Sequence, residues 1–124
     1  MSFSFRGIDH IQLEAPKGHE EKARSFYSGV LGLEEIPKPE NLRSHGGCWF
    51  LCGPQEIHIG SLEPFKAPEK AHPALVVTGL QSLRSHLEEA SYTVEEEEPI
   101  AGRDRLFVKD PFGNRIEFLE YHAL

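Results

Sequence analysis

Four side chains able to bind a metal ion occur at matching places in the two halves of the chain. His10 begins one strand-like run and His72 begins a second. Near the end of each half, His58 lies within Ile-His-Ile and Glu117 lies within Ile-Glu-Phe. A histidine or carboxylate among strand residues needs a partner, because a buried polar group without one is unfavourable. The repeated placement predicts one site assembled from His10, His58, His72 and Glu117.

Imidazole and carboxylate groups are good ligands for Zn, Ni, Mn, Fe and Co, and three of them leave coordination positions open for a substrate. His10, His72 and Glu117 supply that minimum, and His58 adds a fourth ligand or a nearby base. Glu56 shares a strand face with His58, so either side chain could complete the metal shell. Glu56 is also a candidate base for proton transfer, and Glu117 is the second candidate catalytic residue. The remaining histidines receive no chemical role: His19, His45, His86 and His122.

The first half of the chain is expected to hold these side chains on a β-α-β-β-β unit. Alternation over Ile8–Glu14 predicts a strand whose polar face carries His10, while Ile11 and Leu13 point toward the helices. Apolar residues spaced three and four apart predict a helix over Gly18–Leu31, which Gly32 ends. The further strands are expected at Glu34–Pro37, Cys48–Cys52 and Glu56–Gly60, with a tight turn at Gly53–Pro54.

The second half is expected to repeat this order after a linker over Ser61–Ala71, which is rich in proline and charge. The predicted helix spans Gly79–Ala90, and its buried stripe is Leu80, Leu83 and Leu87. Tyr92–Glu98, which contains four consecutive glutamates, is expected to be a solvated edge strand. The other strands are expected at His72–Thr78, Arg105–Lys109 and Arg115–Tyr121, with a turn over Asp110–Asn114. The fold class is therefore α+β, with two tandem βαβββ modules of approximately residues 5–61 and 72–122.

Length and charge restrict the class of protein. A chain of 124 residues is expected to form a single domain with a core of ordinary size. Its net charge of −7 and lack of clustered Lys and Arg argue against a nucleic-acid partner. No apolar stretch is long enough to span a bilayer, so a cytoplasmic protein without a membrane partner is expected. Cys48 and Cys52 lie too far apart on one strand for a disulfide and are expected to be buried free thiols.

Two stretches of the chain resemble the vicinal oxygen chelate superfamily, which contains glyoxalase I, fosfomycin-resistance, bleomycin-resistance and extradiol dioxygenase proteins. The sequence Phe107–Phe118, FVKDPFGNRIEF, is similar to the closing hairpin of that superfamily and its carboxylate ligand. The opening Ile8–Leu13, followed by Ala23–Tyr27 and Leu31–Leu33, is similar to its first strand and helix. The resemblance covers nearly the whole chain.

The resemblance implies a glyoxalase-like domain over residues 1–124, in which the two modules form a curved mixed sheet around a cleft. It also implies a divalent ion at the positions of His10, His58, His72 and Glu117. Such an ion would chelate neighbouring oxygens of a small-molecule substrate and stabilise an enolate or similar oxyanion. The implied enzyme is a lyase, isomerase, thiol transferase or dioxygenase, and we expect a homodimer because members of this superfamily usually pair.

Departures from the subfamily patterns leave the particular reaction open. Glyoxalase I commonly has a carboxylate at the place of His58, and fosfomycin enzymes tend to have a threonine at the place of Gln12. Extradiol dioxygenases use the two histidines and the glutamate but are usually longer chains. Bleomycin-binding proteins lack the metal site, although an acidic chain would suit a cationic drug. The alternative to an enzyme is therefore a non-catalytic resistance protein that binds a drug or metabolite in the same cleft.

Overall fold

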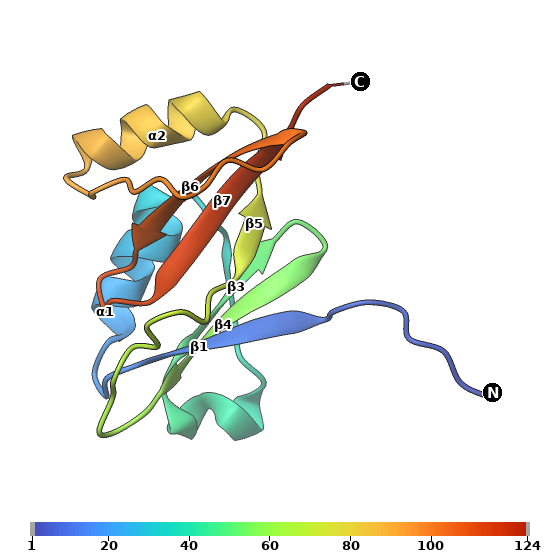
Figure 1. The fold of residues 1–124 in the computed structure, drawn as a ribbon. Helices are drawn as coiled ribbons and strands as arrows, with labels where there is room; N and C mark the ends of the chain where they lie inside the picture. The colour runs from blue at the N-terminus through green and yellow to red at the C-terminus, as the bar shows by residue number, and fades with distance from the viewer. Residues whose placement is uncertain (1, 124) are drawn as a thin grey trace. The chain divides into compact units, whose positions relative to one another are not determined.

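The computed structural model describes residues 2–123, which divide into a first unit ending at Phe65 and a second unit beginning at Lys66 (Figure 1). This boundary falls inside the predicted linker. The elements of the first unit are β1 (His10–Ala15), α1 (Glu20–Ala23), the π-helix η1 (Arg24–Val30), β2 (Glu35–Ile36), the 3-10 helix η2 (Glu40–His45), β3 (Cys48–Cys52) and β4 (Gln55–Ser61). They form a four-stranded sheet in the order β1-β4-β3-β2, in which β1 runs parallel to β4.

The predicted first helix is confirmed, but it widens into a π-helix that the sequence did not indicate. The amide of Leu31 donates to the carbonyl of Phe26 at 2.9 Å, a bond five residues long. Phe26 and Tyr27 are neighbours in sequence and both are buried. Tyr27 stacks on Phe50 of β3 with ring centroids 5.5 Å apart, so the helix covers this face of the sheet.

The alternation predicted for the strands of the first unit is seen in the burial of β1, whereas in β4 His58 is buried together with Ile57 and Ile59. Ile57 and Ile59 of β4 are buried on the same sheet as Phe50, which lies opposite Ile57 in the register. In β1, His10 and Gln12 are exposed, whereas Ile11 and Leu13 are partly buried. The histidines therefore lie on the sheet face opposite the helix, as the period of two required.

The second unit contains β5 (Ala74–Val76), α2 (Leu80–Glu89), β6 (Arg103–Lys109) and β7 (Arg115–Tyr121). Its strands are ordered β5-β7-β6, with β5 parallel to β7 and β6 antiparallel to it. The predicted helix is confirmed, and Leu80 and Leu87 are buried on its inner side. The strand predicted at His72–Thr78 is shorter, since Pro73 has no amide hydrogen to donate at its start.

The strand predicted over Tyr92–Glu98 is largely absent from the described chain. Only Glu95 forms a bridge, to Phe107 on the outer side of β6, so the segment has the predicted edge position without a full ladder. Glu96 instead forms an ion pair with Arg84, and Glu97 forms one with Arg115. Four successive glutamates repel one another, and pairing with basic side chains separates their charges at the expense of regular strand geometry.

The turn between β6 and β7 lies where the sequence predicted it. The buried carboxylate of Asp110 accepts the amides of Phe112 and Asn114, both at 2.9 Å, which fixes the hairpin backbone. Cys48 and Cys52 are free thiols, as predicted; Cys48 is buried and Cys52 is half-buried. Among residues 2–123, no helix has the length and apolar composition needed to cross a membrane.

Candidate metal centre

The strand register confirms the correspondence between the two halves that the sequence suggested. In the first unit, Gln12 pairs with His58 across β1 and β4. In the second unit, Ala74 pairs with Glu117 across β5 and β7. Gln12 lies two residues after His10, and Ala74 lies two residues after His72. The same backbone geometry therefore places His10 beside His58 and His72 beside Glu117.

In the first unit, three aromatic rings from three neighbouring strands lie in one stack. The ring centroids of His10 and His58 are 4.0 Å apart with an interplanar angle of 18°. On the other side of His58, the indole of Trp49 lies 3.8 Å away at an angle of 2°. The register explains the stack, because Trp49 lies directly opposite His58 in the β3–β4 pair. Trp49 was not among the residues predicted for this site.

Glu56 is the hydrogen-bond partner of His58. Its Oε1 lies 2.8 Å from Nε2 of the buried imidazole, while the Glu56 side chain remains one-third exposed. His10 is held differently, because its Nδ1 lies 2.8 Å from the carboxylate of Asp9, which is almost fully exposed. The predicted common face of Glu56 and His58 is thus confirmed, and the two side chains contact each other directly.

In the second unit, His72 and Glu117 form a polar pair at the start of β5. Nε2 of His72 lies 3.0 Å from Oε1 of the buried Glu117 carboxylate. Nδ1 of the same ring lies 2.9 Å from the backbone oxygen of Lys70. A carbonyl oxygen only accepts, so Nδ1 carries a proton and Nε2 is the nitrogen presented to Glu117.

A cation also lies beside the Glu117 carboxylate. Nη1 of Arg105, from the neighbouring strand β6, is 3.7 Å from Oε2 of Glu117. The Arg105 guanidinium also donates to the backbone oxygen of Glu98 and lies 5.3 Å from the ring centre of Phe107. This neighbour was not predicted, since alternation within β7 says nothing about which side chain of β6 reaches Glu117.

The pair in the second unit fits a metal ion. Metal-bound histidines usually donate their second ring N–H to a backbone carbonyl or carboxylate, and His72 does so to Lys70. If the proton shared by His72 Nε2 and Glu117 Oε1 were lost, the lone pairs of these two atoms would both face the space between them, where an ion could bind. This donor set suits borderline divalent ions such as Zn, Fe, Co and Ni.

The pair in the first unit fits an ion only after a ring movement. An ion bound to imidazole lies in the ring plane, along the nitrogen lone pair. The ring planes of His10 and His58 are nearly parallel and intersect far from both rings. One ion therefore cannot lie in both ring planes at bonding distance. Rotation of the His10 side chain, which is 41% exposed, off the stack would free it for coordination while His58 keeps its contact with Trp49.

The two sets of candidate ligands belong to different units, and the structure describes each set within its own unit. It brings His10 together with His58 and Glu56 in the first unit, and His72 together with Glu117 in the second. Within the described residues, no group of three or more acidic, histidine or cysteine side chains is arranged to hold an ion. The assignment of the predicted residues His10, His58, His72 and Glu117 as metal ligands therefore stays a prediction.

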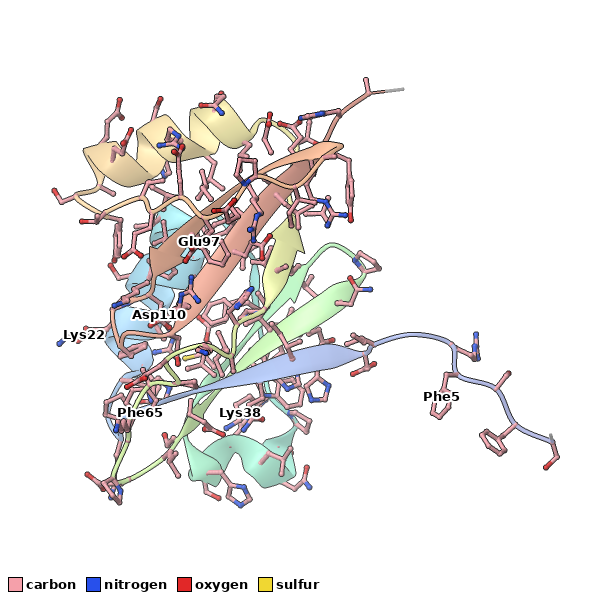
Figure 2. The ribbon with its side chains drawn as sticks, in the orientation of Figure 1. Phe5, Lys22, Lys38, Phe65, Glu97 and Asp110 are labelled. Atoms are coloured by element: carbon pink, nitrogen blue, oxygen red, sulfur yellow. The ribbon has the colours of Figure 1, made fainter. Side chains whose placement is uncertain are left out.

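A hollow of about 230 Å³ adjoins the ring stack on the exposed face of the first sheet. Trp49 and Gln12, the two residues that flank His58 in the sheet, both line it. Gly60 forms part of its floor, where an added Cβ would meet the Gln12 and Glu14 side chains at 2.7 Å. Lys38, which is labelled in Figure 2, also lines the hollow. Leu42 and His45 of η2 line it as well. This lining offers an aromatic surface together with charges of both signs.

Residues 7–118 match the Glyoxalase/Bleomycin resistance protein/Dioxygenase superfamily, and the chain belongs to that superfamily. A crystal structure described as that of a glyoxalase family protein from Bacillus anthracis is 47% identical and has a TM-score of 0.95. That match covers 98% of this chain and 100% of the other. The resemblance and the α+β glyoxalase-like fold predicted from the sequence are thereby confirmed.

More distant structures share the fold alone. Lactoylglutathione lyase from Agrobacterium tumefaciens is 22% identical, with a TM-score of 0.72 and coverage of 92% of each chain. A glyoxalase/dioxygenase from Nostoc punctiforme is 19% identical, with a TM-score of 0.78 and coverage of 95% of this chain and 92% of the other. No match was found among curated proteins.

Proposed function

We propose that this protein is a divalent-metal-dependent enzyme acting on a small substrate that chelates the ion through neighbouring oxygen atoms. The observation that carries the proposal is the His72–Glu117 pair, in which a carbonyl-anchored imidazole presents Nε2 to a buried carboxylate at 3.0 Å. An imidazole whose second ring nitrogen is held by a backbone carbonyl, as His72 is by Lys70, has the orientation usual for a metal-bound histidine. His10 and His58, at the corresponding register positions of the first unit, supply the other ligands.

The bound ion would supply a positive charge that stabilises an oxyanion developing on the substrate. Three neutral imidazoles and one carboxylate leave a divalent ion with net positive charge, which favours this role. Glu56 is the base in the proposal, because it holds a hydrogen bond to His58 and remains partly exposed to a bound substrate. In this arrangement Glu56 accepts a proton from the substrate, and His58 orients the accepting carboxylate.

The hollow beside the ring stack is the proposed place for the part of the substrate that does not touch the ion. It lies next to His58 through Trp49 and Gln12, so a substrate at the ion extends into it. At about 230 Å³ it has room for a group of roughly eight non-hydrogen atoms, taking about 30 Å³ for a water-sized group.

The proposal is tested by loading the protein with Mn, Fe, Co, Ni or Zn and measuring turnover of three substrate types. These are glutathione hemithioacetals, fosfomycin with a thiol, and catechols under oxygen. Glu117→Gln keeps the shape of the side chain but removes its charge, so metal affinity and turnover should each fall at least about 100-fold. His86→Ala, on the outer side of α2, serves as the control and should change neither quantity.

A second candidate function is metal-free binding of a cationic drug or metabolite. It is favoured by the stacked rings of His10, His58 and Trp49, which as they stand offer an aromatic surface rather than two converging ligands. The net charge of −7 suits a cationic guest. Tight binding of a cationic drug by chelator-treated protein, with no turnover in any of the three assays, would select this function and exclude the enzyme.

A further inference from the structure

A hollow of about 280 Å³, named here the β2 hollow, lies beside the edge strand β2 and belongs wholly to the first unit. Cys48 lines it from β3, and Arg24 lines it from η1, the helix that covers this sheet. Cys48 and Trp49 are successive strand residues, so their side chains point to opposite faces of the sheet. The β2 hollow therefore lies on the other face from the ring stack of the candidate metal centre.

The lining of the β2 hollow is basic, although the chain as a whole is acidic. Arg24, Lys38 and Arg43 line it, and Glu35 is the acidic side chain among the lining residues of the described chain. The three cations come from separate segments: the start of η1, the chain after β2, and η2. Together with Glu35 they give the hollow a local charge of +2. Like charges repel one another, and an anion between them removes that repulsion.

Each of the three cations is held in place by a contact within the unit. Nε of Arg24 donates to both carboxylate oxygens of Glu35, at 2.9 and 3.0 Å. Nε of Arg43 donates to the backbone oxygen of Lys38 at 3.3 Å, and Nζ of Lys38 donates to the backbone oxygen of Gly46. Side chains fixed in this way lose less conformational freedom when a ligand binds.

These contacts leave hydrogen-bond donors at the β2 hollow. Both arginines use Nε alone, and among residues 2–123 the terminal nitrogens of their guanidinium groups have no hydrogen-bond acceptor. The Lys38 ammonium has further hydrogens besides the one donated to Gly46. Terminal guanidinium nitrogens donate well to the paired oxygens of a phosphate or carboxylate group.

Two neighbouring groups add no negative charge to the β2 hollow. The Glu20 carboxylate accepts the amide of Gly47 at 2.8 Å and lines a different hollow of the unit. Burial raises the pKa of the Cys48 thiol to about 11, so this side chain is neutral at neutral pH. The donors of the hollow therefore face an anion without a second carboxylate that competes for them.

We propose that the β2 hollow binds a phosphate group, either as inorganic phosphate or as part of a small phosphomonoester. Arg24 and Arg43 donate through their terminal nitrogens, and Lys38 donates through its ammonium. At about 30 Å³ for each small group, the hollow holds roughly nine non-hydrogen atoms, which is more than phosphate alone contains. A carboxylate has fewer oxygens and less charge, so it satisfies fewer of these donors. Because the site uses none of the predicted metal ligands, metal-free protein is sufficient to test it.

The test titrates chelator-treated protein with inorganic phosphate and, separately, with glycerol 3-phosphate, at constant ionic strength, and follows backbone amide signals by NMR. Arg24→Gln and Arg43→Gln should each raise the dissociation constant at least about tenfold, because each removes a charged donor. The matched control is Arg84→Gln, which removes an ion-paired arginine from α2 in the second unit and should leave binding unchanged. Thermal melting establishes that each variant is folded.

The wild-type titration gives a readout that does not depend on any variant. Saturable shifts at the amides of Gly47 and Cys48, which chloride at the same ionic strength does not reproduce, are the expected result. Tighter binding of glycerol 3-phosphate would identify the phosphomonoester as the preferred form, and tighter binding of phosphate would identify the free anion. No saturable shift at the β2 hollow, the same shifts with chloride, or equal weakening by Arg84→Gln and Arg24→Gln would each overturn the proposal.

Discussion

At the residue scale, the Glu117 carboxylate has two neighbours that compete with a metal ion for its charge. His72 contacts one oxygen at 3.0 Å, and Arg105 lies 3.7 Å from the other. The arginine is not a ligand, so its charge opposes binding of a cation at Glu117. The structure thus places a cation at the carboxylate on which the proposed metal site depends.

Arg105→Gln is expected to tighten binding of a divalent ion by roughly tenfold, because it removes a positive charge within 4 Å of a ligand oxygen. The matched control is Lys109→Gln, which removes an exposed charge from the same strand and should have little effect. Isothermal titration with Zn or Mn under identical buffer conditions measures both. Weaker binding by Arg105→Gln would mean that the arginine supports the carboxylate's position more than it opposes the ion.

Cys48 provides a second prediction at this scale. Burial raises the pKa of its thiol to about 11, so the reactive thiolate is scarce at neutral and mildly alkaline pH. At pH 8 iodoacetamide should modify Cys48 at least about 100-fold more slowly in the native protein than in guanidinium-unfolded protein. Peptide mass spectrometry against time measures the two rates. Rapid native modification would show that β3 opens locally or that the thiol is not buried in solution.

At the scale of elements, the start of α2 is held by a side chain from another element. The Glu120 carboxylate of β7 accepts the amides of Gly79 and Leu80, both at 3.0 Å. Gly79 has a φ of 87° and no side chain, so it cannot supply the usual cap itself. These two hydrogen bonds therefore hold the N-terminus of α2 against the sheet.

These hydrogen bonds predict a pH-dependent contribution to stability. The backbone amides of Leu80 and Gly79 hold the pKa of Glu120 below its ordinary value of 4.5. A carboxylate with a lowered folded pKa stabilises the fold above its ordinary pKa, and this contribution disappears as the pH falls through the folded value. Glu120→Gln should therefore lower the melting temperature at pH 7, and the difference from wild type should shrink below pH 4.5.

The control for Glu120→Gln is Glu89→Gln at the other end of the same helix. A carboxylate there faces the negative end of the helix dipole, so its removal should be neutral or slightly stabilising. Calorimetric melts of the three proteins across the acid range make the comparison. A constant difference between Glu120→Gln and wild type at all pH values would show that the carboxylate charge is not what fastens α2.

At the scale of the whole molecule, the proposal requires one divalent ion per chain. The expected ligands come from both units, so His10→Ala in the first unit and His72→Ala in the second should each reduce affinity strongly and keep the fold. Elemental analysis of protein purified without chelator, followed by titration, measures the stoichiometry. Two independent ions per chain, or loss of binding from one unit's variants only, would contradict a single shared set of ligands.

The sequence by itself determined the order of the elements and the correspondence between the halves. Both follow from local rules, because strand residues alternate every two positions and helix residues recur every three to four. This is why the face of His10, the α2 helix and the Asp110–Asn114 turn were predictable. The prediction of a strand over Tyr92–Glu98 was wrong for a non-local reason, because Glu96 and Glu97 form ion pairs with basic side chains of other elements in the unit.

Only the tertiary structure decided which side chains meet. Trp49 on His58, Arg105 beside Glu117 and Glu120 at the start of α2 all join residues from different elements. Such contacts depend on strand register and on the reach of individual rotamers, neither of which is encoded in the spacing along one strand. The sequence could therefore name the chemical groups of the candidate site and the common face of Glu56 and His58, whereas the fold alone supplied Trp49 and Arg105 as their further neighbours.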